Sequence, residues 1–478
     1  MTNRSLHRRA VLAAGFALPA LASAFAAGAA EPFRFKSSAG VETDAERGDF
    51  EVPEDRRDPG SRRIRLSYVR FPSTAARPGP PIVYLAGGPG GTATGAAAGR
   101  RFPIFMALRE VADVIAFDQR GTGASNHIPR LSPQPTPLPA FTRAGLTADV
   151  RAEFSRAWAE WTAAGVSMAG YNTAQSADDI DDLRRHLGAE KIDLWGISYG
   201  SHLGLSVLRR HGRRIGRVAL ASLEGQDQTV KRPAHADAYL RRVDALLGAD
   251  PALRATIPDL LALMRRVHAR LEAAPVRITV PVRGAPTEVT VGGFAVQLLA
   301  GSLIANPETL VMLPGLYLAL DAGEVSVLKP FITQIAGLPG VNGMPEAMDL
   351  ASGISPRRLA LVQREARTAA LGDALNFPMP HLLGAVPGVD LGEAFRAPMR
   401  IDHPALLVSG TLDGRTPLEE QAEVAAQFRH ASRVIVENAG HNVFEAHPEV
   451  QGMLVRFFRG EAVADTRLSL PTPKFKLG

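Results

Sequence analysis

The stretch Gly196-Ile197-Ser198-Tyr199-Gly200 has the form G-x-S-x-G and decides the fold. The mostly apolar run 191–195 before it predicts a strand, and residues 201–212 after it predict a helix that ends at a glycine. A strand, a sharp turn and a helix would hold Ser198 on a strained elbow, where glycines at 196 and 200 avoid a clash across the turn. Ser198 is therefore a candidate nucleophile.

A serine hydroxyl is protonated at neutral pH, so it needs a general base, and the base needs an acid that orients it. Predicted strands at 404–410 and 433–437 lead into the loops that carry Asp413 and His441. The carboxyl ends of parallel strands share one sheet edge, so we expect both side chains to lie beside Ser198. The order Ser198, Asp413, His441 predicts a catalytic triad.

Three other residues compete for these two roles. Glu224 follows the predicted strand 217–223 and is the alternative acid. Asp402 precedes its strand, so we expect it at the opposite edge of the sheet. His447 stands at the start of the last predicted helix, where we expect a surface residue.

An oxyanion hole is predicted from a glycine loop. A predicted strand at 80–86 runs directly into Gly87-Gly88-Pro89-Gly90-Gly91. Acyl transfer develops negative charge on the carbonyl oxygen and needs preorganised backbone N–H donors. We expect one donor at Tyr199, the residue after the nucleophile, and the other at Gly88, because Pro89 has no N–H.

Three motifs together carry a family resemblance: residues 86–91, 118–125 and 195–200. They resemble the prolyl iminopeptidase and tripeptidyl aminopeptidase branch of the α/β-hydrolases, and residues 48–55 are similar to the entry strand of the tripeptidyl type. The resemblance implies the α/β-hydrolase fold, serine chemistry and cleavage at the amino terminus of peptides. Ala86 departs from the histidine that iminopeptidases usually have there.

Strands predicted at 62–70, 81–86, 111–117, 191–195, 217–223, 404–410 and 433–437 alternate with helical patterns. This alternation predicts an α/β protein with a mostly parallel, doubly wound sheet covered on both faces. We expect the core in two parts, 31–225 and 399–478, separated by a mainly helical cap at 226–398 that contains a hairpin. A cap at this point would cover the carboxyl edge of the sheet and set specificity.

Residues 1–30 predict an export signal. Basic residues precede an apolar, alanine-rich run, and small residues follow it. The adjacent Arg8 and Arg9 resemble a twin-arginine signal. We therefore expect export to the periplasm, without stable membrane association afterwards.

Composition excludes several functional classes. The chain has no cysteine, which excludes disulfides, thiolate catalysis and cysteine metal ligands. The net charge is +6, but the arginines are scattered along the chain, so we expect no nucleic-acid partner. No metal-ligand spacing or phosphate-binding loop is recognised, so we expect neither a metal nor a cofactor.

The predicted function is acyl transfer by an exported serine aminopeptidase acting on peptides. A small-molecule carboxylesterase with the same triad is the alternative, and a non-catalytic binding module is a third possibility. A peptide substrate would present a free ammonium group, which an acidic side chain should receive. Glu224 is one candidate for that role, and Asp227, Asp237 or another acidic residue of the cap are others.

Overall fold

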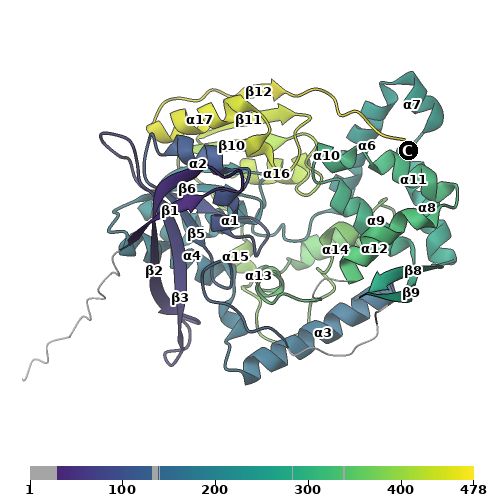
Figure 1. Ribbon diagram of the computed structural model, residues 1–478, viewed down its shortest axis with the longest axis horizontal. Helices are drawn as coiled ribbons and strands as arrows, with labels where there is room; N and C mark the ends of the chain where they lie inside the picture. The colour runs from purple at the N-terminus through teal and green to yellow at the C-terminus, as the bar shows by residue number, and fades with distance from the viewer. Residues whose placement is uncertain (1–29, 132–137, 139, 283, 337–339, 478) are drawn as a thin grey trace, which may run out of the picture.

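The computed structural model describes residues 30–131, 138, 140–282, 284–336 and 340–477, so the predicted export signal lies almost wholly outside the described residues. A ten-stranded sheet forms its centre, in the order β1-β2-β3-β5-β4-β6-β7-β10-β11-β12 (Figure 1). The first four strands in this order pair antiparallel, and all strands from β5 onward run parallel. The strands are β1 (Glu31–Lys36), β2 (Glu42–Pro53), β3 (Arg63–Phe71), β4 (Ile82–Leu85), β5 (Val114–Asp118), β6 (Ile192–Ile197), β7 (Ile215–Ala221), β10 (Ala405–Gly410), β11 (Ala431–Glu437) and β12 (Thr466–Ser469).

Helices cover both faces of this sheet. Successive strand residues point to opposite faces, so Val83 and Leu85 of β4 join one buried apolar cluster while Ile82 and Tyr84 join another. The first cluster contains α4 (Thr173–His186), α5 (Tyr199–His211) and α16 (Leu418–Ala425), and the second contains α1 (Ala93–Ala98), α2 (Phe102–Leu108) and α17 (Pro448–Arg459). The predicted mostly parallel, doubly wound sheet is confirmed.

Strands β1, β2 and β12 were not among the strands predicted from apolar runs. Strand β2 buries few of its residues and is rich in charged side chains, because it lies in the antiparallel extension of the sheet with one side facing solvent. A half-exposed strand of this kind carries little hydrophobic signal. Only the family resemblance, at residues 48–55, pointed to it.

The chain between β7 and β10 forms a cap. Most of its buried apolar side chains form a separate cluster, while most of those between residues 341 and 362 join the first core cluster. Its elements are α6 (Pro233–Gly248), α7 (Pro251–Thr256), α8 (Leu260–Ala273), the hairpin β8 (Val276–Val282) and β9 (Ala285–Val291), α9 (Gly293–Leu303), α10 (Pro307–Leu310), α11 (Leu313–Asp321), α12 (Lys329–Ala336), α13 (Met344–Ser352), α14 (Pro356–Glu365) and α15 (Glu393–Arg396). Helices α7 and α8 are separate, because Pro258 disfavours helix before it and Asp259 caps α8. The limits 226–398 stay a prediction.

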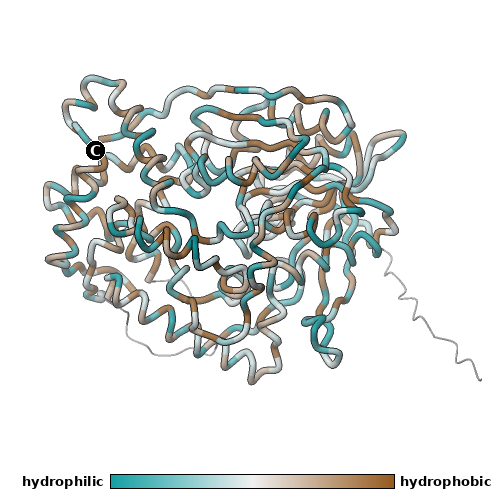
Figure 2. The backbone as a smooth tube through the Cα atoms, turned by 180° about the vertical axis from the view of Figure 1, so that it is seen from behind, coloured by the Kyte–Doolittle hydropathy of each residue, from teal (hydrophilic) through white to brown (hydrophobic). Residues whose placement is uncertain are grey.

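Two segments outside those limits also reach the cap. Helix α3 (Arg143–Ala163) follows Phe141, which forms a bridge with Val291 of the hairpin. After β12 the chain crosses to the cap, where Lys476 exchanges backbone hydrogen bonds with Val311 (2.9 Å) and Gly315 (3.1 Å) (Figure 1). Hydrophobic residues occur in both the sheet and the cap, as expected for two parts that each contain buried apolar side chains (Figure 2).

Across the described part of the chain, every helix is too short or too polar to cross a lipid bilayer.

Candidate active site

Ser198 stands on a sharp turn between β6 and α5. Its φ and ψ are 56° and −129°, a backbone conformation that costs on the order of 1–3 kcal/mol for a residue with a side chain. A Cβ atom at position 200 would lie 2.0 Å from the Leu85 carbonyl oxygen, and one at 196 would lie 2.7 Å from the carbonyl oxygen of residue 200. Glycine is therefore required on both sides of the turn that presents the serine.

Asp413 and His441 are in direct contact. Both carboxylate oxygens of Asp413 lie 3.0 Å from His441 Nδ1. Asp413 is fully buried, and its Oδ1 accepts hydrogen bonds from the backbone N–H groups of Arg415 and Thr416, while Oδ2 accepts one from the Thr416 hydroxyl at 2.6 Å. Burial opposes ionisation, but His441 and Thr416 outweigh it and hold the pKa of the Asp413 carboxyl below its ordinary value. The carboxylate is thus suited to orient and stabilise a charged imidazole.

The loop of His441 extends back toward the strand of the serine. His441 follows β11, and its carbonyl oxygen accepts a hydrogen bond from the Ser222 hydroxyl at 2.8 Å. Ser222 follows β7, which is the direct neighbour of β6 in the sheet. The side chains at 198, 413 and 441 therefore all emerge at the carboxyl edge of neighbouring parallel strands.

The glycine loop lies against the serine. A Cβ atom at Gly87 would lie 3.1 Å from Ser198 Cβ and 3.7 Å from its Oγ. Gly88 has a φ of 122°, where a side chain is strained. Tyr199 is the first residue of α5, so its N–H has no acceptor within the helix. Gly88 thus belongs to the loop that packs against the serine and Tyr199 directly follows the serine, so both stay predictions for the oxyanion hole.

Two family models match this chain. A model described as alpha/beta hydrolase fold matches residues 80–273, and one described as TAP-like protein matches residues 390–466. The first match includes the glycine loop and Ser198, and the second includes Asp413 and His441. The chain has the α/β-hydrolase fold.

Named relatives of this α/β-hydrolase are peptidases. It is 32% identical over 174 residues to the tripeptidyl aminopeptidase of Streptomyces lividans, a match that covers 32% of this chain and 30% of that one. It is 27% identical over 190 residues to the serine protease Hip1 of Mycobacterium tuberculosis, a match that covers 36% of this chain and 35% of Hip1. It is 32% identical over 145 residues to a probable proline iminopeptidase of Streptomyces coelicolor, a match that covers 30% of this chain and 33% of that one. The matches span only about a third of each relative's length.

The competing residues of this chain have other partners. Glu224 is buried and forms an ion pair with Lys231 Nζ at 2.8 Å. Asp402 is exposed and pairs with Arg429 at 3.0 Å. His447 caps α17, with its Nδ1 accepting from the Glu449 N–H at 3.2 Å. His441 is hydrogen-bonded to Asp413, not to Glu224 or Asp402.

Sequence reasoning did not single out Asp349, which lies beside the site. It belongs to α13, a cap helix whose Met348 Sδ accepts a hydrogen bond from the Tyr199 hydroxyl at 3.2 Å. Pro345 of the same helix covers the glycine loop, since a Cβ at Gly90 would lie 2.7 Å from its Cγ. Helix α13 therefore covers the predicted oxyanion hole.

The Asp349 carboxyl has an unusual setting. Burial, and secondarily the nearby Glu224, raise the pKa of Asp349 well above its ordinary value. Among the described residues it forms no ion pair, whereas Glu224 forms one with Lys231. No local motif marks Asp349, and only the packing of α13 on the core brings it close to Tyr199.

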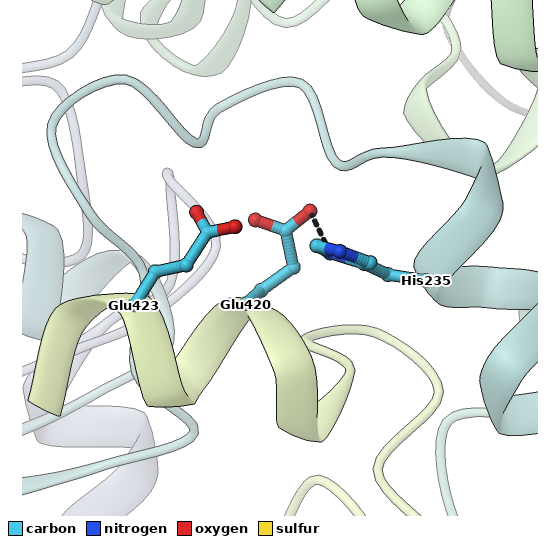
Figure 3. Close-up of side chains that lie close together, drawn as sticks. All are labelled: His235, Glu420 and Glu423. Atoms are coloured by element: carbon cyan, nitrogen blue, oxygen red, sulfur yellow. Dashed lines mark hydrogen bonds and ion pairs between the residues drawn. The ribbon is translucent and has the colours of Figure 1, made fainter.

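A second cluster, formed by His235, Glu420 and Glu423, has ligand atoms close enough to hold a metal ion (Figure 3). Glu420 already accepts hydrogen bonds from His235 Nδ1 at 3.0 Å and from Arg358, while Glu423 accepts from Gln228 at 2.8 Å. These donors satisfy the oxygens that a metal would need. The contacts favour a structural role, in which α16 of the core is tied to α6 and α14 of the cap.

Proposed function

We propose that this chain is a serine peptidase that removes residues from the amino terminus of peptides. The observation that carries this proposal is the hydrogen-bonded pair of the buried Asp413 with His441, at the same sheet edge as the strained Ser198. The names of the relatives support a peptidase, and the coverage of the triad loops by two family models supports serine hydrolase chemistry.

The proposed reaction is acyl transfer in two stages. His441 Nε2 takes the proton of the Ser198 hydroxyl as Oγ bonds to the scissile carbonyl carbon, and the amides of Gly88 and Tyr199 receive the resulting oxyanion. The C–N bond then breaks, and His441 gives its proton to the departing amine. Water, activated by the same imidazole, cleaves the acyl-enzyme and restores the serine. Asp413 holds the imidazole and stabilises its charged form throughout.

The acidic groups under α13 support recognition of a free amino terminus. Asp349 is unpaired among the described residues, and Glu224 lies near enough to raise its pKa. A substrate ammonium placed beside Asp349 would relieve this repulsion and pair with the carboxylate. We propose Asp349 as the principal partner of the ammonium group, with Glu224, already paired with Lys231, contributing to the negative field.

Export to the periplasm forms part of the proposal and rests on the sequence of residues 1–30.

A substrate comparison tests the proposed function. Peptide arylamides with free amino termini are compared with the same peptides after acetylation and with short nitrophenyl esters. An aminopeptidase should cleave the free peptides and lose at least about tenfold in kcat/KM on acetylation, the loss expected for one charge-assisted contact. Hydrolysis of esters alone would instead establish the carboxylesterase. Labelling by a fluorophosphonate that is absent in Ser198→Ala would establish the nucleophile, and unchanged labelling would refute the proposal.

A further inference from the structure

One turn of the cap contacts both loops that carry the predicted acid and base. This turn joins α9 to α10 and consists of Ile304, Ala305 and Asn306, here named the cap turn. The Ile304 carbonyl accepts a hydrogen bond from the N–H of Gly414, the residue after the predicted acid, at 3.0 Å. The Ala305 carbonyl accepts one from the N–H of His441 itself at 2.8 Å. Adjacent carbonyl groups of the cap thus bind two separate loops of the core.

The side chain of Asn306 adds a third contact. Its Oδ1 accepts a hydrogen bond from the N–H of Asn442 at 3.0 Å. The Asn442 side chain is in turn held from the core, because its Oδ1 accepts from Arg101 Nη2 at 3.1 Å. The residue that follows the predicted base is therefore held by the cap on one side and by the core on the other.

The sequence of the core loops permits this close approach. A Cβ atom at Gly414 would lie 2.4 Å from the Ile304 carbonyl oxygen, and one at Gly440 would lie 2.6 Å from Asn306 Cα. Leu412, next to the predicted acid, packs into the apolar cluster of the cap. Any larger residue at either glycine would separate the loops from the cap turn.

The cap turn is itself firmly held. The buried Tyr239 hydroxyl donates to the Ile304 carbonyl at 3.0 Å, and the Asn306 carbonyl accepts from the Leu310 N–H at 2.9 Å. A turn anchored in this way can fix the position of the loops that it contacts, rather than follow them.

We propose that the cap turn positions the acid and histidine loops, so that the triad is fully assembled only when the cap is docked on the core. Asn306 is the positioning residue whose side chain makes this contact. The inference rests on the proposed serine hydrolase function, because it concerns the geometry of that triad. Small displacements of a catalytic group are costly, so the contact should affect turnover more than substrate binding.

The test compares four variants of the full-length protein, using a short nitrophenyl ester and a fluorophosphonate probe. Asn306→Ala removes the side-chain oxygen that accepts from the Asn442 N–H. Asn306→Ser has a shorter side chain that cannot reach this N–H but still favours a helix start, and Asn306→Asp retains the accepting oxygen. Thr309→Val is the matched control, because it removes hydrogen bonds to the Leu303 and Asn306 carbonyls in the same turn without touching the core loops. We expect kcat and the labelling rate to fall about 10- to 100-fold in the alanine and serine variants, with KM within about twofold. The aspartate variant and the control should stay within about threefold of the wild type.

Several outcomes would overturn the inference. One is an alanine variant with normal kcat, and another is a change confined to KM, which would make the cap turn part of the substrate site. An equal loss in Thr309→Val would show general loosening of the turn. If Asn306→Ala does not fold, the kcat and KM of Asn306→Ser are judged by the same criteria. A wild type that the probe does not label would refute the proposed function and this inference together, whereas equal labelling of wild type and variants would refute the inference alone.

Discussion

Replacing Asp413 by asparagine isolates its electrostatic role, because the two side chains have nearly the same shape. The Oδ1 position accepts two backbone N–H groups, both at 2.9 Å, so the asparagine must keep its oxygen there. Its NH₂ group then occupies the Oδ2 position, which, like Oδ1, lies 3.0 Å from His441 Nδ1. The imidazole therefore faces an N–H donor in place of one carboxylate oxygen, and the negative charge is lost. Both changes favour the tautomer with its proton on Nε2, which can no longer accept the proton of Ser198.

We expect Asp413→Asn to lower kcat about 10⁴-fold, by analogy with asparagine substitutions in other triads. This factor corresponds to about 5.5 kcal/mol of transition-state stabilisation. Arylamide or ester turnover gives kcat, and the rate of fluorophosphonate labelling gives the reactivity of Ser198 directly. Thermal unfolding verifies that the variant is folded.

Asp402→Asn is the matched control, because this exposed carboxylate precedes β10 and pairs only with the exposed Arg429 among the described residues. It should retain wild-type activity. The reasoning is refuted if Asp413→Asn keeps kcat within about tenfold of the wild type while Glu224→Gln loses about 10⁴-fold, since Glu224 would then be the acid.

Three further predictions concern the surroundings of the triad. Asp349→Asn should lower kcat/KM for free-amino peptides about tenfold or more and leave ester hydrolysis unchanged. Burial and Glu224 raise the pKa of Asp349, so the wild-type preference for free-amino peptides should grow as pH rises through that pKa. The Asp349→Asn variant should lack this rise. Gly88→Ala should lower kcat on the order of 10²–10³-fold, because its Cβ would lie 2.8 Å from the Gly90 nitrogen and displace a proposed oxyanion donor. Thermal unfolding should also occur at a lower temperature, because the φ of 122° at this position strains a side chain. Glu420→Gln should lower the free energy of unfolding by about 3–5 kcal/mol in denaturant titrations, since it leaves the buried Arg358 guanidinium with only the more distant Glu423 carboxylate at 3.4 Å. Burial opposes ionisation of Glu420, but His235 and Arg358 hold the pKa of its carboxyl below the ordinary value, so this difference should be complete above about pH 4.3 and disappear as pH falls through the lower pKa.

Much of the core could be predicted because its signals are local. The buried parallel strands around Ser198 are continuous apolar runs, and the elbow needs glycine within two residues of the serine, so neighbours in sequence carry the whole pattern. Helix α3 had a readable signal that the prediction did not use, since its buried residues recur at helical spacing: Val150, Phe154, Ala157 and Trp161. Strand β2 had almost no hydrophobic signal of this kind, because its exposed side is charged.

The amino-acid sequence by itself determined where the buried strands lie along the chain, the serine elbow and the glycine loop, since each depends on residues close together along the chain. The contact of Asp413 with His441 depends on the sheet order, which brings their two loops together. It could be predicted because each residue directly follows a predicted strand. Only the tertiary structure decided that Lys231 pairs with Glu224, that α13 brings Asp349 beside Tyr199, and that the cap turn binds both catalytic loops. The physical reason is that these contacts join segments far apart in the chain through hydrogen bonds and packing, which leave no periodic pattern in the sequence of either partner.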